Sequence, residues 1–225
     1  MSQHIILTIP HETCVEKTKF CDLAALKLAN QLEISLANQN RIIEVFHGDI
    51  NRQTVDLNRK YSRETRFRNT VRLYLLEYIK NLIQNKTDYN ITEEKIVYLI
   101  DCHSFTPGDH KYGNIRVSNP DISILFNQCS ILNIIEELTD ICKDHDLAVT
   151  KHYGIIDDII DEFANYNNTF NLQKYGIKII PILIELNENI EEKRMHKIGL
   201  SINEWIKSIN QYLINQPYSS QIQFF

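Results

Sequence analysis

The chain has 225 residues, of which 43% are hydrophobic and 24% are charged, and its formal net charge at pH 7 is -5. A chain of this length is typical of one domain that buries roughly 70% of its unfolded surface, so we expect a single domain over residues 1–225. The weakly acidic composition offers no basic surface for nucleic acid or an anionic membrane, and neither partner is expected.

The sequence has no apolar stretch of bilayer-spanning length, and its N-terminus has no basic region followed by a signal-type apolar core. Its five cysteines are odd in number and form no CxxC pairs, which argues against a secreted disulfide scaffold. We therefore expect a cytoplasmic protein.

The first predicted strand, residues 5–10 (IILTIP), runs into a polar loop at His11. Apolar residues at helical spacing then predict a helix over residues 22–36. Asp22 stands at its start, where an aspartate could cap the helix or face a metal ion. A second strand is predicted over residues 42–46.

The most polar part of the chain is residues 49–68, which contain five arginines. This local enrichment favours an anion-binding site. Ser62 is a good N-cap residue and predicts the start of a long amphipathic helix that ends near Asn85. The alternative interpretation is that Arg66 and Arg68 only line the solvated face of this helix.

Two later segments have the pattern of buried strands that end in polar residues. The run of five apolar or aromatic residues at 96–100 stops at Asp101, and the run at 177–184 stops at Glu185. In open α/β sheets, ligands bind outside the carboxyl ends of the strands. We therefore expect the residues that follow these strands to form the functional site.

In the remaining segments, strand-like apolar runs alternate with stretches that have apolar residues at helical spacing. This alternation predicts an α/β fold, a three-layer sandwich with a mostly parallel mixed central sheet. The further elements are strands at 121–126 and 148–153 and helices at 132–143, 155–166 and 190–213.

The ends of the buried strands supply candidate metal ligands. Zinc hydrolases hold the ion through three protein ligands and leave one position for water. His11 and His103 each end a predicted strand, although either could merely cap it. We favour Asp22 as the third ligand, with Cys14 and Glu12 as alternatives.

Glu185 interrupts an apolar run, where a charge is costly unless it has a partner or a task. A carboxylate beside a zinc-bound water can act as general base and then as general acid. The alternative is that Glu185 is simply the first loop residue after the strand. Asp101 is expected to support His103 rather than to bind metal itself.

The segment around Arg59 is a candidate for binding a substrate carboxylate. The planar guanidinium of Arg59 can grip a carboxylate through two bonds, Asn58 could hold the same group, and Asp56 could orient an arginine. The alternative is a solvated charged loop.

A serine or cysteine hydrolase is disfavoured. Ser104 adjoins His103, and adjacent residues seldom align as nucleophile and base. The chain also lacks a GxSxG elbow, and nothing in the sequence supports a nucleophilic role for Cys102.

Four short motifs, taken in order, resemble the N-formylglutamate amidohydrolase family, which shares its fold with the zinc carboxypeptidases. They cover the chain from residue 5 to about residue 190. The motifs are Pro10-His11, Asp56-Leu57-Asn58-Arg59, Asp101-Cys102-His103-Ser104 and Glu185-Leu186-Asn187.

The resemblance implies that His11 and His103 are zinc ligands, that Arg59 with Asn58 binds a carboxylate, and that Glu185 is the catalytic base. Arg52 resembles a second basic residue that polarises the scissile carbonyl or holds substrate. The zinc carboxypeptidases have His-x-x-Glu where this chain has a cysteine at position 14. Asp22 resembles the carboxylate that opens the first helix in the relatives.

These patterns predict a zinc-dependent amidohydrolase, with one Zn²⁺ per chain, that cleaves a small N-acyl amino acid resembling N-formyl-glutamate. The expected partner is a small-molecule substrate with a carboxylate. One alternative is a zinc carboxypeptidase or deacylase that acts on peptides. Another is a non-catalytic, metal-stabilised binding module.

Overall fold

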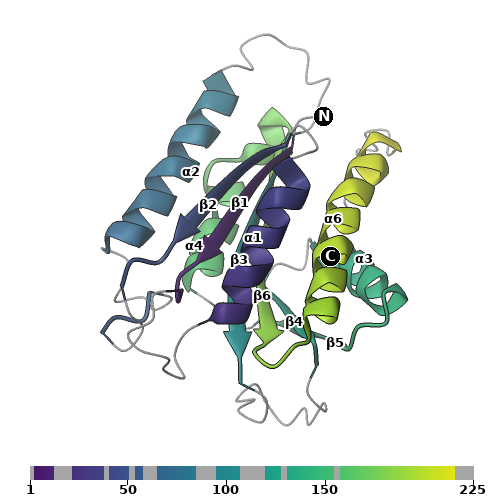
Figure 1. The fold of residues 1–225 in the computed structure, drawn as a ribbon. Helices are drawn as coiled ribbons and strands as arrows, with labels where there is room; N and C mark the ends of the chain where they lie inside the picture. Colours follow the sequence, from purple (N-terminus) through teal and green to yellow (C-terminus); the bar gives the residue numbers. More distant parts are fainter. Residues whose placement is uncertain are drawn as a thin grey trace.

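A six-stranded sheet in the order β2-β1-β3-β6-β4-β5 forms the centre of the protein (Figure 1). The computed structural model describes residues 3–12, 22–37, 41–50, 54–57, 65–84, 95–106, 120–127, 131–154 and 158–215. All neighbouring strands are parallel except β4 and β6, so the predicted mostly parallel mixed sheet is confirmed. The strands are β1 (Gln3–Ile9), β2 (Ile42–His47), β3 (Lys95–Phe105), β4 (Ile122–Phe126), β5 (Val149–Tyr153) and β6 (Ile177–Asn187).

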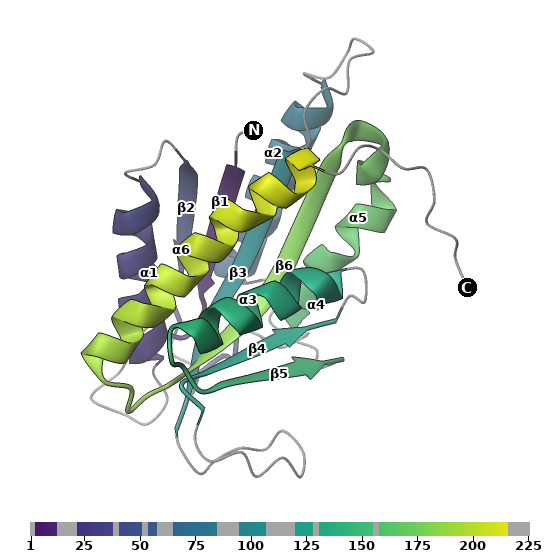
Figure 2. The same cartoon turned by 90° about the vertical axis from the view of Figure 1, so that its right-hand side faces the viewer.

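Helices cover both faces of the sheet, which confirms the three-layer prediction (Figure 2). One layer consists of α1 (Leu23–Ala37), α3 (Leu132–Asp144) and α6 (Glu192–Asn215). The other contains α2 (Arg66–Gln84), α4 (Asp158–Ala164), α5 (Tyr166–Thr169) and the 3-10 helix η3 (Leu172–Tyr175). Within the described ranges, each helix is too short or too polar to cross a bilayer.

Alternation along the strands explains the unbroken apolar runs in the sequence. In β3, Tyr98 and Ile100 pack on the α1, α3 and α6 side, whereas Val97 and Leu99 pack on the α2 and α4 side. Because both faces are buried, successive residues are all apolar instead of alternating with polar ones. The indole of Trp205 lies against Tyr98 and donates a hydrogen bond to the Ile134 carbonyl at 2.8 Å.

Two strand ends differ from the sequence prediction. The sequence pattern predicts that the two buried runs stop at Asp101 and Glu185, but β3 continues to Phe105 and β6 to Asn187. The parallel ladder between the two strands carries on and pairs His103 with Glu185. Polarity does not end these strands because partners across the sheet take up the polar side chains, as Thr8 does by donating to Asp101 at 2.6 Å. Glu185 is therefore a strand residue and not the first residue of a loop.

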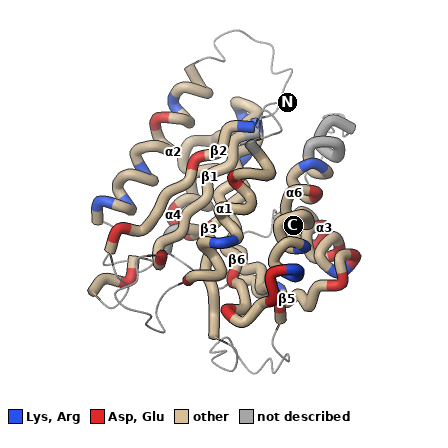
Figure 3. Tube along the Cα trace, viewed as in Figure 1, with Lys and Arg blue, Asp and Glu red and all other residues tan. Residues whose placement is uncertain are grey.

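Other differences are smaller. Arg66 is exposed as the alternative interpretation required, whereas Arg68 is buried. The predicted helix over 155–166 is divided into α4 and α5, and residues 155–157 lie outside the described residues, as do Ser62 and Asn85. Figure 3 shows acidic and basic residues intermixed on α2, α3 and α6, which fits the modest net charge of -5.

The amino end of β1 carries a buried histidine that the sequence did not single out. The His4 ring stacks on Tyr78 with 3.9 Å between ring centroids, and its Nε2 lies 3.0 Å from the Tyr74 hydroxyl. Burial lowers the pKa of His4 to about 4. The folded protein therefore holds this imidazole neutral well below pH 6.5.

We expect His4 to make the folded protein less stable in acid. Between pH 6.5 and pH 4 the unfolded chain binds a proton at His4 that the folded chain does not, so stability falls as the pH falls. The loss amounts to about 2 kcal/mol of unfolding free energy by pH 5. Urea unfolding of wild type and of His4→Phe at pH 8 and pH 5 gives the loss of unfolding free energy in each protein. The contribution of His4 is the extra loss in wild type, because the other titrating groups contribute equally to both proteins. Equal losses in the two proteins would contradict this assignment.

Candidate metal centre

Three buried side chains converge at the carboxyl edge of the sheet. His11, Asp22 and His103 each offer one ligand atom, and these atoms all lie within 4.8 Å of one another. His11 follows β1, Asp22 immediately precedes α1, and His103 lies within β3. Two imidazoles and one carboxylate are a donor set that suits zinc. The structure thus brings together the three residues that the sequence selected as metal ligands.

Main-chain contacts fix the position of His11. Its carbonyl accepts a hydrogen bond of 3.0 Å from the Asp22 amide, which ties the start of α1 to the end of β1. The Gly48 amide donates to the Ile9 carbonyl at 2.9 Å. A Cβ atom at Gly48 would lie 2.0 Å from the Pro10 carbonyl oxygen, so only glycine allows the two chain segments to approach this closely.

Two carboxylates hold the His103 ring. Its Nδ1 lies 3.1 Å from Asp22 Oδ2, and its Nε2 lies 3.0 Å from Asp101 Oδ2. Burial alone would lower the pKa of His103, but the charges and hydrogen bonds of Asp101 and Asp22 outweigh it and raise that pKa well above its ordinary value. Both carboxylates therefore favour the protonated form of this ring.

The arrangement around His103 fits a divalent ion. Two ligands bound to zinc at about 2.0–2.1 Å in a tetrahedral site are about 3.3 Å apart, close to the observed separation of 3.1 Å between His103 Nδ1 and Asp22 Oδ2. Metal-ligating histidines usually donate their other ring N–H to a carboxylate, and Asp101 occupies that position here. Thr8 in turn donates to Asp101, so the ring orientation is set through two successive hydrogen bonds.

His11 also has a carboxylate beside it, from a segment that the sequence interpretation linked to substrate. Its Nε2 lies 3.2 Å from Asp56 Oδ1. The buried Arg68 fixes this segment by donating to the Leu57 carbonyl at 3.1 Å and to Glu162 on α4 at 2.9 Å. Sequence reasoning missed the contacts of Asp56 and Arg68, because these residues meet their partners only in the folded chain.

Glu185 lies beside the metal-ligand candidates on the sheet. It is 8% exposed and is paired in register with His103 on β3 and with Ser123 on β4. Neighbouring residues in register project to the same face of a sheet, so Glu185 shares the face of Asp101 and His103. The Glu185 carboxylate can therefore exchange protons with a molecule bound at the carboxyl edge of the sheet.

The remaining sequence candidates divide into two groups. Glu12, an alternative third ligand, directs its carboxylate to His47 at the end of β2. The other alternative ligand and the proposed substrate-binding residues lie outside the described residues and stay predictions. They are Cys14, Arg52, Asn58 and Arg59.

The structure adds no support for Ser104 or Cys102 as a nucleophile. Cys102 is fully buried on the α1 side of the sheet, where burial and then the charges of Asp101 and Asp22 raise the pKa of its thiol. Ser104 donates its hydroxyl hydrogen to Glu188. Neither group is arranged as an activated nucleophile.

Solved structures of other proteins share this fold. The chain resembles a gene product of Agrobacterium tumefaciens with a TM-score of 0.57 and 12% sequence identity, over 94% of this chain and 90% of that one. It also resembles N-formylglutamate amidohydrolase from Ralstonia eutropha with a TM-score of 0.52 and 9% identity, over 93% of each chain. No family sequence model and no curated protein sequence matches the chain. At these identities the likeness is one of fold.

The close contact at Gly48 leads to a stability prediction. Gly48→Ala should destabilise the protein by roughly 1–3 kcal/mol, because the new Cβ forces the backbone at Pro10 to move. Gly199→Ala in α6 is the matched control. Its Cβ would lie 3.3 Å from the end of the flexible Gln31 side chain, and alanine favours the helix. Urea unfolding midpoints measure both changes, and equal stability of the two variants would contradict the prediction.

Proposed function

We propose that this chain is a zinc-dependent amidohydrolase that cleaves a small N-acyl amino acid resembling N-formyl-glutamate. The observation that carries the proposal is the buried group of His11, Asp22 and His103 at the carboxyl edge of the sheet. The shared fold with an N-formylglutamate amidohydrolase supports the choice of reaction. The sequence motifs that resemble this family support the same choice.

In this proposal, the three ligands hold the ion and the groups around them orient the ligands. A bound zinc ion supplies a Lewis acid for the scissile carbonyl and lowers the pKa of a water molecule. Asp101, fixed by Thr8, sets the ring orientation of His103. Asp56 lies beside His11, with its Oδ1 3.2 Å from the Nε2 of that ring.

Glu185 is proposed as the proton carrier. It accepts the proton of the attacking water and passes it to the leaving nitrogen. Its register position beside His103 supports this role. Arg59 and Asn58 are proposed to bind the carboxylate of the substrate, and Arg52 is proposed to polarise its carbonyl or to hold it.

Elemental analysis of purified protein tests the metal centre directly. We expect about one zinc per chain in wild type and a loss of zinc in both His103→Ala and Asp22→Ala, because each removes one of three protein ligands. Glu12→Gln is the control, since the Glu12 carboxylate contacts His47 instead. Zinc retained in Asp22→Ala would show that another residue supplies the third ligand. A wild type that takes up no metal after zinc reconstitution would contradict the proposal.

Glu185→Gln tests the proposed proton carrier. The variant should keep zinc and fold while its kcat falls by about 10²–10⁴-fold, because glutamine cannot accept the proton. Turnover of N-formyl-glutamate measures the change, and Glu204→Gln at the exposed Glu204–His145 pair is the control. An unchanged rate in Glu185→Gln would remove the proposed base.

Short peptides assayed beside N-formyl-glutamate separate the amidohydrolase from a carboxypeptidase, since only a peptidase releases a C-terminal residue. A zinc-loaded protein that hydrolyses none of these compounds would favour a metal-stabilised binding module.

A further inference from the structure

At the start of α1, the residue in the N-cap position directs its carboxylate to His103. Asp22 immediately precedes the helix and has the position of an N-cap residue, whose side chain commonly accepts hydrogen bonds from first-turn amides. Its carbonyl accepts from the Leu26 amide at 3.1 Å, as expected at a helix start. Its carboxylate, however, lies 3.1 Å from His103 Nδ1. If that carboxylate serves the metal centre, the first-turn amides need another acceptor.

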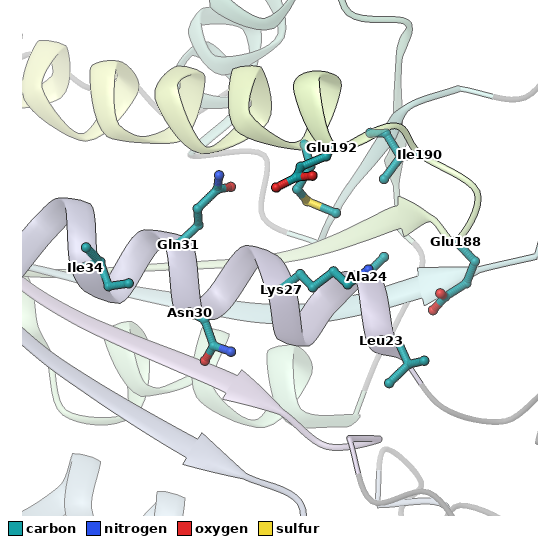
Figure 4. Close-up of a pocket in the computed structure, with 10 residues that line it drawn as sticks. Leu23, Ala24, Lys27, Asn30, Gln31, Ile34, Glu188, Ile190 and Glu192 are labelled. Atoms are coloured by element: carbon teal, nitrogen blue, oxygen red, sulfur yellow. The ribbon is translucent and has the colours of Figure 1, made fainter. Parts of the chain in front are cut away.

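Glu188 supplies that acceptor from a distant part of the sequence. Its half-buried carboxylate accepts hydrogen bonds from the backbone amides of Leu23 and Ala24 and from the Ser104 hydroxyl. Its own amide donates to the Phe105 carbonyl at 3.0 Å, so the turn after β6 is fixed against the end of β3. Figure 4 shows the Glu188 side chain beside the first turn of α1.

We propose that Glu188 is a positioning residue for the metal centre, an inference that rests on the proposed function. Its carboxylate bonds to the residue directly after each of two candidate ligands, since Leu23 follows Asp22 and Ser104 follows His103. By capping α1, Glu188 leaves the Asp22 carboxylate available to the metal. By bonding Ser104, it holds the end of β3 at a fixed distance from α1.

A neighbouring carboxylate provides a matched control. Glu188 and Glu192 both line a groove of about 590 Å³ between α1 and α6, and Glu192 lies at the first turn of α6 (Figure 4). Within the described part of the chain, no hydrogen bond joins Glu192 to Leu23, Ala24 or Ser104. Glu192→Gln therefore removes a charge from the same groove without touching the bonds that Glu188 makes.

The experiment measures zinc affinity by competition with a chromophoric chelator, and ligand geometry by the visible spectrum of the Co²⁺-loaded protein. We expect Glu188→Ala to weaken zinc binding about 10–100-fold and to alter the Co²⁺ spectrum, as loss of a group that orients ligands does. Glu188→Gln, which retains one acceptor oxygen, and Ser104→Ala should show smaller changes in the same direction. Glu192→Gln should match wild type. Unfolding of the metal-free proteins reports any separate loss of helix capping.

The outcomes distinguish this inference from the proposal on which it rests. A wild type that binds zinc, with unchanged affinity and spectrum in the Glu188 variants, would show that Glu188 only caps α1 and would overturn the inference alone. A wild type that binds no metal would overturn the metal centre and the inference together. If Glu188→Ala does not fold, Glu188→Gln and Ser104→Ala provide the test. The inference is overturned if the zinc affinity and Co²⁺ spectrum of both variants equal those of Glu192→Gln.

Discussion

The pairing of one buried imidazole with two carboxylates governs the arrangement of the whole carboxyl edge. His103 lies between Asp22 and Asp101 where water is largely excluded, and buried charges are tolerated only when they are paired and hydrogen-bonded. Each carboxylate therefore needs contacts of its own that fix its position. Thr8 holds Asp101, and the main chain at the start of α1 holds Asp22. The geometry of the edge thus follows from one electrostatic requirement.

The parallel sheet is what allows these groups to meet. The registers of β1, β3 and β6 place Thr8 beside Asp101 and His103 beside Glu185. Residues two apart on a strand share a face, so all four side chains face the layer that contains α2 and α4. Apolar clusters lie on both faces of the same sheet. The sheet therefore combines an apolar interior with a polar end on the same strands.

Local patterns predicted the types of element and the order of layers, because the long helices have apolar residues at helical spacing and the central strands are unbroken apolar runs. They failed at the ends of β3 and β6, where side chains that look like loop residues find partners across the sheet. The ligand candidates could be selected because histidines and a carboxylate stand near strand ends and a helix start. The contact between His11 and Asp56 could not be predicted, since no local pattern in the intervening chain indicates it.

The contact between Asp22 and His103 spans 81 residues of sequence and has a kinetic consequence. Closing so long a loop costs entropy, so we expect the edge to assemble after β1 and β3 have paired and α1 has docked. Contacts that form late in folding affect the unfolding rate more than the folding rate. A ligand of this edge is therefore expected to prolong the lifetime of the native state, while the speed of folding is set by the apolar sheet and its helices.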